Sequence, residues 1–214
     1  MKEYKTEILS HLNPGSLEKA VRLIQTGELV AFPTDTVYGL GCSPFSPNSL
    51  EQIYQVKQRP EEKAIPVLVA NLEQVRQVVA NIPPQVEGIM AEFWPGALTL
   101  VLPRQFTLPT QLTPYPGLAV RMPRHHLALQ ILEKTGPLAV TSANLSAHAE
   151  TLSAQDVYDQ LKGRIPLILD DGTHPDGKAS TVIDCLGAEP VLLRQGPLPY
   201  EEILKKWKAY GKDI

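Results

Sequence analysis

The clearest indication of the fold is ELVAFPTDTVYGLG, residues 28–41. Its first five residues are mostly apolar and include β-branched and aromatic side chains, which predicts a buried strand over residues 28–32 that ends at Pro33. The next segment, PTDTVYGLG, supplies two hydroxyls, one carboxylate and two glycines directly after that strand. Such a segment either positions a polar ligand or forms an Asx-type turn without a ligand.

The same alternation of strand-like and helical patterns continues along the chain. The first helix is expected to begin at Ser16 and to stop at Gly27, and a second opens with the cap-and-proline pair Ser46-Pro47. Further helices are expected at residues 71–80, 84–93, 125–134, 153–161 and 200–208, and strands at residues 65–69, 97–102, 118–122, 138–141, 167–170, 181–185 and 191–194. This order predicts one α/β domain over residues 1–214, with a mixed sheet, a core at about 14–197 and a C-terminal helix at 200–208.

The composition is that of a globular protein. Of 214 residues, 43% are hydrophobic and 20% charged, and the formal net charge of −3 excludes a uniformly basic nucleic-acid coat. Aromatic residues make up only 6%, which disfavours broad base stacking. The two cysteines, Cys42 and Cys185, lie outside any CxxC pattern, which favours inert thiols over a zinc site and leaves a disulfide open. No signal-like or membrane-spanning apolar run is present, so we expect a soluble, cytoplasmic protein with no membrane partner.

Lys57 and Arg59 are the first candidates for chemistry. Lys57 continues the apolar helix face of Leu50, Ile53 and Tyr54, where a lysine either extends its ammonium to solvent or faces a ligand. Arg59 precedes a helix-ending proline, which helps to fix its direction. Two cations near one helix end suggest an anion site.

Other polar residues interrupt apolar strands. Arg121 and Arg194 each lie in such a strand, where an arginine either pairs with a carboxylate or faces a ligand cavity. TSANLS, residues 141–146, follows an apolar run and either recognises an anion or forms a capped turn. GTHPDGKA, residues 172–179, nearly matches a phosphate loop, but Ala179 cannot bind magnesium and a strand is expected to follow. No nucleophile–base pair and no protein metal site is indicated.

Together these motifs resemble the YrdC domain, the threonylcarbamoyl-AMP synthase family. The matching segments occur in the family's order and extend over about 85% of the chain: PTDTVYGLG (33–41), KQRP (57–60), FWPGALTLVL (93–102), GLAVRMPRH (117–125), TSANLSA (141–147), STVID (180–184) and LLRQG (192–196).

The resemblance implies a single α/β domain with a twisted, open sheet around a positively charged cavity. It also implies condensation of L-threonine, bicarbonate and ATP into L-threonylcarbamoyl-AMP, with release of pyrophosphate. A partner transferase would then modify tRNA next to the anticodon. No metal site of the protein's own is implied, and Mg²⁺ is expected to arrive with ATP.

Site residues carry over from the same motifs. The family's KxR and SxN elements fall on Lys57, Arg59, Ser142 and Asn144, which are expected to bind ATP phosphates and stabilise charge at the α-phosphorus. Arg194 is expected to contact the nucleotide. Thr34, Arg121 and Ser180 are the expected threonine contacts, with Arg121 binding the carboxylate through both prongs of its guanidinium.

The chain departs from its relatives at three points. Residues 65–69 lack the histidine that many relatives have there, so one threonine contact is expected to be missing, and Thr141 and Ala179 replace a frequent proline and glutamate. Longer members add a linker and a second domain, and because this chain ends at Ile214 we expect any lid they supply to be absent or replaced.

Two other functions fit the same residues. One is a non-catalytic module for double-stranded RNA or tRNA, which salt-sensitive RNA binding without ATP turnover would identify. The other is a carbamoyl-adenylating enzyme that uses carbamoyl phosphate, although such proteins carry further regions and cysteines that this chain lacks.

Overall fold

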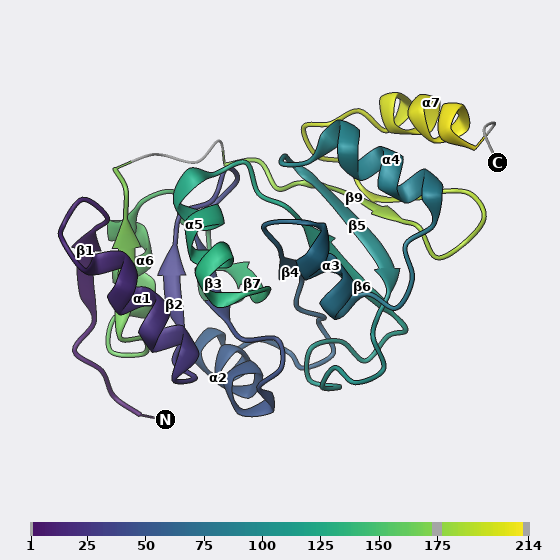
Figure 1. Ribbon diagram of the computed structural model, residues 1–214. Coiled ribbons are helices and arrows are strands. Elements are labelled where there is room, and N and C mark those ends of the chain that lie inside the picture. The colour runs from purple at the N-terminus through teal and green to yellow at the C-terminus, as the bar shows by residue number, and fades with distance from the viewer. Residues whose placement is uncertain (1, 173–176, 212–214) are drawn as a thin grey trace.

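A mixed sheet runs through the whole molecule (Figure 1). The computed structural model describes residues 2–172 and 177–211, and within these residues the sheet has ten strands. They are β1 (Glu7–Ser10), β2 (Val30–Phe32), β3 (Gly39–Cys42), β4 (Val67–Leu68), β5 (Leu98–Pro103), β6 (Gly117–Arg121), β7 (Leu138–Ser142), β8 (Leu167–Asp170), β9 (Thr181–Asp184) and β10 (Val191–Arg194). Their order is β1-β8-β2-β3-β7-β4-β6-β5-β9-β10, and parallel and antiparallel pairs are mixed.

Helices cover both faces of the sheet. They are α1 (Ser16–Gln25), α2 (Pro47–Lys57), α3 (Leu72–Val78), α4 (Pro84–Phe93), α5 (His126–Thr135), α6 (Ala154–Leu161) and α7 (Tyr200–Tyr210). The helices α1 and α5 lie side by side over one end of one face, and their buried side chains pack on β2, β7 and β8 (Figure 1). The other five helices contribute to a second, larger core on the opposite face.

Strand alternation separates the two cores. In β2, Val30 and Phe32 join the core under α1 and α5, whereas Ala31 points to the other core. Because successive side chains of a strand point to opposite faces, the same alternation governs the strands farther along the sheet. Leu98, Leu100 and Leu102 of β5 all belong to the larger core, so Thr99 and Val101 face the side that α1 and α5 only partly cover.

The predicted α/β architecture is confirmed, with two strands missed. Residues 39–42 form β3, although the sequence placed GLG in a segment expected either to position a ligand or to turn. The strands β2 and β7 on either side supply backbone hydrogen bonds that outweigh the low strand propensity of glycine. Residues 7–10 form β1, a short edge strand with no strong apolar pattern. The first helix begins at Ser16 as expected, but its N-cap is Gly15, whose φ is +81°, and no side chain caps it.

Three further expectations can be compared with the structure. Part of GTHPDGKA lies outside the described residues, but the strand β9 follows it, as expected, where a phosphate loop requires a helix. Cys42 and Cys185 are both buried and free, which removes the disulfide left open above. In the described part of the chain, no helix is long and apolar enough to cross a membrane.

Candidate active site

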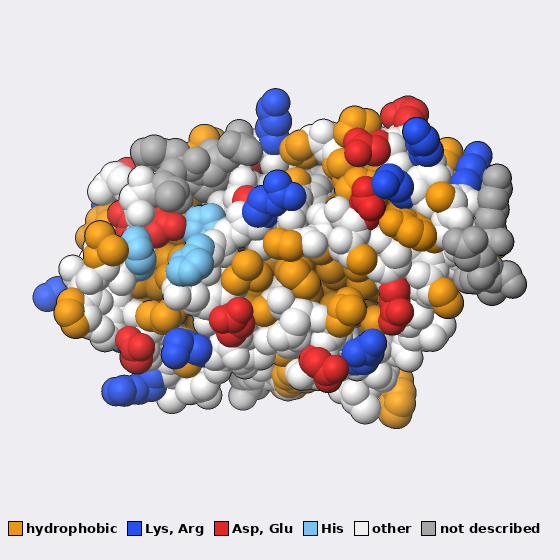
Figure 2. Space-filling view, turned by 45° about the horizontal axis from the view of Figure 1, so that its top comes forward, with side chains coloured by type: hydrophobic (Ala, Val, Ile, Leu, Met, Phe, Trp, Pro, Cys, Tyr) orange, Lys and Arg blue, Asp and Glu red, His pale blue; other side chains and the backbone are white. Residues whose placement is uncertain are grey.

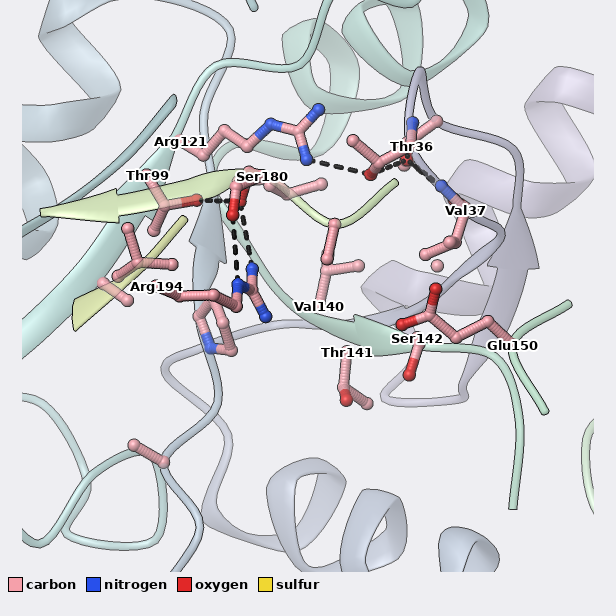
Figure 3. Close-up of a pocket in the computed structure, with 18 of the residues that line it drawn as sticks. Thr36, Val37, Thr99, Arg121, Val140, Thr141, Ser142, Glu150, Ser180 and Arg194 are labelled. Atoms are coloured by element: carbon pink, nitrogen blue, oxygen red, sulfur yellow. Dashed lines mark hydrogen bonds between the residues drawn. The ribbon is translucent and has the colours of Figure 1, made fainter. Parts of the chain in front are cut away.

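A cavity of about 330 Å³ opens on the sheet face that α1 and α5 leave partly uncovered. Leu68 and Val140 belong to the core under those helices and also line the cavity, which places it beside that core. Figure 3 shows side chains from several strands converging on it. The lining residues are Thr34, Thr36, Val37, Gly39, Arg59, Ala64, Pro66, Leu68, Thr99, Ala119, Arg121, Val140, Thr141, Ser142, Glu150, Ala179, Ser180, Val182 and Arg194.

Strand register brings these residues together. Gly39 of β3 pairs with Ser142 of β7, and Leu68 of β4 pairs with Arg121 of β6. Thr99 pairs with Val182, which in turn lies opposite Arg194 at an irregularity in the β9–β10 ladder. Cross-strand partners share one face of a sheet, so residues far apart in sequence form one surface.

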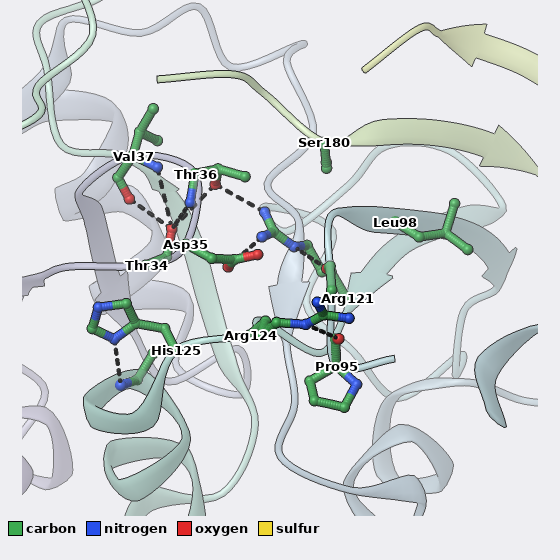
Figure 4. Close-up of polar contacts among 12 residues, drawn as sticks. Thr34, Asp35, Thr36, Val37, Pro95, Leu98, Arg121, Arg124, His125 and Ser180 are labelled. Atoms are coloured by element: carbon green, nitrogen blue, oxygen red, sulfur yellow. Dashed lines mark hydrogen bonds and ion pairs between the residues drawn. The ribbon is translucent and has the colours of Figure 1, made fainter. Parts of the chain in front are cut away.

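Arg121 is held from three directions. It is 6% exposed, and its Nε donates to the carbonyl of Gly96 (2.9 Å) and its Nη1 to Thr36 Oγ1 (2.9 Å). Its Nη2 forms an ion pair with Asp35 (Figure 4). Of the two alternatives for an arginine in an apolar strand, the structure therefore has both: a carboxylate partner and a place in the cavity wall. Five N–H groups minus these three bonds leave two for a ligand.

The hydroxyls of Thr34 and Thr36, beside Arg121, form a short hydrogen-bond chain in which the donor of each bond can be assigned. Thr34 Oγ1 donates to the carbonyl of Val37 (2.7 Å), so its 3.1 Å contact with Thr36 Oγ1 uses the hydrogen of Thr36. The backbone N–H groups of Thr36 (3.2 Å) and Val37 (3.3 Å) share the remaining acceptor capacity of Thr34 Oγ1, so the segment is a turn stabilised by the Thr34 hydroxyl and not by an Asx side chain, as the sequence had suggested. Thr36 Oγ1 retains one free lone pair, whereas the bonds of Thr34 Oγ1 are all within the turn.

Ser180 and Arg194 form the opposite wall. Ser180 Oγ lies 2.7 Å from Thr99 Oγ1, and Arg194 donates from Nε to the Ser180 carbonyl (3.0 Å) and from Nη2 to Ser180 Oγ (3.3 Å; Figure 3). Arg194 thus buttresses Ser180 and also lines the cavity. It has no carboxylate partner among the residues that the structure describes.

Arg59 reaches the cavity because the chain turns sharply after α2. Gln58 adopts a left-handed conformation (φ 52°), and the N–H of Arg59 donates to the Tyr54 carbonyl (2.9 Å). Its guanidinium donates from Nη2 to the Ala64 carbonyl (3.0 Å). The turn and this bond orient the side chain and leave N–H groups for an anion.

Lys57 does not line the cavity, contrary to the expectation that both cations point into one space. Its side chain is 1% exposed, so its ammonium does not extend to solvent either. Nζ donates to the backbone carbonyls of Ser142 and Asn144 and to Asn144 Oδ1 (3.3 Å). Asn144 Oδ1 also accepts from Ser142 Oγ (2.5 Å), and the N–H of Ser146 donates to the Lys57 carbonyl (2.9 Å). Lys57 and Asn144 therefore hold the loop that presents Ser142.

Burial changes the acid–base behaviour of Lys57. Desolvation, with a smaller contribution from the neighbouring charge of Arg59, lowers the pKa of Lys57 to about 7. No carboxylate lies among its hydrogen-bond partners, and the neutral oxygens that accept from Nζ offset the cost of a buried charge less than a carboxylate would.

A second cleft, of about 610 Å³, is larger but chemically unlike the first. It lies between α2 and the loop before β6, and Glu51, Glu61 and Glu62 line it without any cation. Three carboxylates repel phosphates and carboxylates, so this cleft does not fit the anionic ligands that the sequence predicts. Among the described residues, no group of three or more His, Cys, Asp or Glu could hold a metal ion.

Six of the eight candidate residues line one cavity: Thr34, Arg59, Arg121, Ser142, Ser180 and Arg194. Lys57 and Asn144 lie beneath it. Sequence reasoning missed Thr99 and Glu150 as lining residues. Thr99 had a usable signal, a hydroxyl in an otherwise apolar strand, whereas Glu150 is an exposed loop residue with none.

Comparison with known proteins agrees with this geometry. The family model Sua5_yciO_yrdC, described as "Telomere recombination", matches residues 22–196. A threonylcarbamoyl-AMP synthase of Pyrococcus abyssi is 42% identical over 188 residues, which are 87% of this chain and 55% of that protein. One of Bacillus subtilis is 39% identical over 204 residues, 92% of this chain and 58% of that protein. The chain thus spans little more than half the length of these two relatives.

A solved structure shares the fold. The crystal structure of P. abyssi Sua5 complexed with L-threonine superposes with a TM-score of 0.88 and 39% identity, over 94% of this chain and 60% of that one. The family match extends from within α1 to just beyond β10 and therefore includes every element that lines the cavity. The chain belongs to the Sua5/YciO/YrdC family.

Proposed function

We propose that this chain is an L-threonylcarbamoyl-AMP synthase, which condenses L-threonine, bicarbonate and ATP and releases pyrophosphate. The observation that carries the proposal is the convergence of three guanidinium groups, those of Arg59, Arg121 and Arg194, on one cavity of about 330 Å³. The substrates bring a carboxylate, a bicarbonate and a triphosphate to one place, and guanidinium groups suit all three because they bind planar oxyanions through paired N–H donors.

Threonine fits the wall built by Arg121. The two free N–H groups of Arg121 would bind the α-carboxylate, with Ser180 Oγ beside it. The free lone pair of Thr36 Oγ1 would accept from the amino group. The direct contact with threonine assigned to Thr34 from the sequence stays a prediction. In the structure, the Thr34 hydroxyl stabilises the turn that positions Thr36.

The nucleotide fits the wall built by Arg59 and Ser142. Arg59 would bind phosphate oxygens, and Ser142 would donate from the loop that Lys57 and Asn144 hold. Arg194 would lie near the nucleotide from the opposite side. A charge-assisted hydrogen bond of this kind contributes about 1.5–3 kcal/mol, so a few of them stabilise the developing charge appreciably.

The reaction requires no covalent enzyme intermediate. The amino nitrogen of threonine and bicarbonate form N-carboxythreonine with loss of water. A carboxylate oxygen of that species attacks the α-phosphorus, and the bond to the β-phosphate oxygen breaks to release pyrophosphate. The cavity residues act by holding the reactants together and balancing charge.

Mg²⁺ fits this site only as a companion of the nucleotide. Bound Mg²⁺ would neutralise charge on the phosphates and on the leaving pyrophosphate. Magnesium is usually held by one or two carboxylates together with substrate phosphates, and the described part of the cavity wall offers one carboxylate and several hydroxyls.

Transfer of the threonylcarbamoyl group to tRNA by a partner enzyme, in the cytoplasm, completes the proposal. The RNA-binding alternative has less support. On the face shown in Figure 2, basic and acidic side chains are interspersed, and its described part has no extended basic area. The formal net charge of −3 agrees with that distribution.

Pyrophosphate release tests the proposal directly. ATP and Mg²⁺ are supplied with threonine and bicarbonate, and each of the latter two is omitted in turn. Release that requires both supports the synthase. Release without threonine points to other adenylation chemistry, and no release by folded protein that binds tRNA favours the RNA-binding module.

A further inference from the structure

Among the described residues that line the cavity, Glu150 is the single carboxylate. It lies in the loop between β7 and α6, and Figure 3 shows its side chain directed toward Ser142 and the cavity interior. No pattern in the sequence singles it out, and the roles proposed above for individual residues do not include it. Its placement beside Ser142 puts it on the proposed phosphate side of the site.

The backbone around Glu150 is anchored on both sides. Asn144 Nδ2 donates to the His148 carbonyl (2.7 Å), and Gln160 Nε2 donates to the Ala149 carbonyl (3.1 Å). Beyond it, the N–H of Tyr38 donates to the Thr151 carbonyl (3.0 Å). These bonds therefore fix the backbone position from which the Glu150 side chain projects, although the side chain itself is exposed.

The carboxylate of Glu150 has no hydrogen-bond or ion-pair partner among residues 2–172 and 177–211. The cavity holds three guanidinium groups, and within the described part of the chain only Arg121 is paired with a carboxylate, that of Asp35. An anchored, unpaired carboxylate beside a triphosphate site would repel the phosphates if nothing lay between them.

We propose that Glu150 supplies an oxygen ligand to the divalent cation that accompanies the nucleotide. The inference rests on the proposed function, because it takes the phosphates to lie near Ser142 and Arg59. Mg²⁺ prefers carboxylate and phosphate oxygens and keeps several waters, so one protein carboxylate is sufficient. The lack of any acidic cluster able to hold a metal by itself, within the described residues, agrees with a cation that binds together with the phosphates.

This role predicts that Glu150 couples nucleotide affinity to the presence of the cation. A carboxylate that binds the cation raises affinity for the nucleotide only when the cation is present. Without the cation, the same carboxylate repels the phosphates. Glu150→Gln keeps the shape and removes the charge, so it separates the two effects.

Calorimetric titration with α,β-methylene-ATP, which cannot release pyrophosphate, measures that coupling without turnover. Wild type, Glu150→Gln and the matched control Glu189→Gln, an exposed loop glutamate outside the cavity, are each titrated with Mg²⁺ and with EDTA. We expect Mg²⁺ to tighten binding to wild type and to the control about 10-fold more than binding to Glu150→Gln. In EDTA, Glu150→Gln should bind at least as tightly as wild type.

Different failures have different meanings. An equal gain from Mg²⁺ in all three proteins overturns the role of Glu150 and leaves the synthase intact. An equal gain together with weaker threonine binding by Glu150→Gln overturns it in favour of a contact with the substrate amino group. No nucleotide binding by wild type overturns the proposed function and this inference with it. Unchanged thermal melting of Glu150→Gln verifies that the variant is folded.

Discussion

Among single residues, Arg121 links the fold to the proposed chemistry. Its Nε–Gly96 bond connects β6 to the segment before β5, and its Asp35 and Thr36 partners connect it to the turn after β2. Burial lowers the pKa of the guanidinium, and Asp35 opposes that effect. The ion pair therefore keeps a buried charge in place and directs its remaining N–H groups into the cavity.

Replacement of Arg121 by lysine should weaken threonine use more than catalysis. A lysine ammonium is a point charge and cannot reproduce the two-pronged contact, so the KM for threonine should rise about 10- to 100-fold while kcat changes much less. Threonine-dependent pyrophosphate release measures both constants. Arg76→Lys, an exposed arginine on α3, is the matched control, and an unchanged KM in Arg121→Lys would contradict the assignment.

Lys57 should make stability depend on pH in a known direction. Because the pKa of Lys57 is about 7 in the folded protein and near 10.5 in the unfolded chain, the unfolded chain binds more protons between those values. The free energy of unfolding therefore gains a contribution that rises with pH, by at most about 1.4 kcal/mol per pH unit.

Urea unfolding of wild type and Lys57→Met at pH 7, 8 and 9 isolates that contribution, because all other groups titrate in both proteins. The stability of wild type relative to the variant should increase at each step. Parallel pH dependences of the two proteins would contradict the lowered pKa. If Lys57→Met is too unstable to measure, Lys57→Gln gives the same comparison with a side chain that keeps a donor.

Between elements, the tightest approach in the site lies where the segment after β10 passes the start of β9. A Cβ atom on Gly196 would come within 2.3 Å of the Thr181 backbone nitrogen and 2.4 Å of the Ser180 carbonyl carbon. Neither is a flexible side chain, so the backbone that presents Ser180 and Arg194 would have to move. Only glycine permits this crossing without displacement.

Gly196→Ala should destabilise the fold by about 1–3 kcal/mol and weaken threonine use as Ser180 shifts. Gly187→Ala is the matched control, since its Cβ would meet only the Glu189 carbonyl at 3.8 Å. Urea unfolding and threonine-dependent turnover of the two variants give the comparison. Equal stability of Gly196→Ala and Gly187→Ala would show that the β9–β10 segment yields easily.

At the scale of the whole molecule, charge distribution argues against tight RNA binding by this chain alone. The formal net charge is −3, and basic and acidic groups are interspersed on the face shown in Figure 2. We expect labelled tRNA to bind no more tightly than non-specific nucleic acid does, about 10⁻⁴ to 10⁻⁶ M at physiological salt, in fluorescence anisotropy. Nanomolar binding that weakens steeply with salt would contradict this expectation.

The sequence predicted the architecture, and six of its eight candidate residues line the cavity. Strand and helix periods are local properties, so nearly every long element was identified. The GLG strand was missed because its pairing with β2 and β7 is a tertiary effect that glycine propensity opposes. The partners of Lys57 were also missed. Helix periodicity placed Lys57 on the buried face, but it could not reveal that the carbonyls of Ser142 and Asn144 accept hydrogen bonds from its ammonium.

The alternation of core-facing and cavity-facing side chains in β5, β6 and β9 also bears on how such a site can evolve. Leu100, Val120 and Ile183 belong to the hydrophobic core on one face, while Thr99, Arg121 and Val182 line the cavity on the other. Substitutions on the cavity face leave the core packing on the other face untouched. The same scaffold can therefore acquire new specificities through single replacements at every second position, with little loss of foldability.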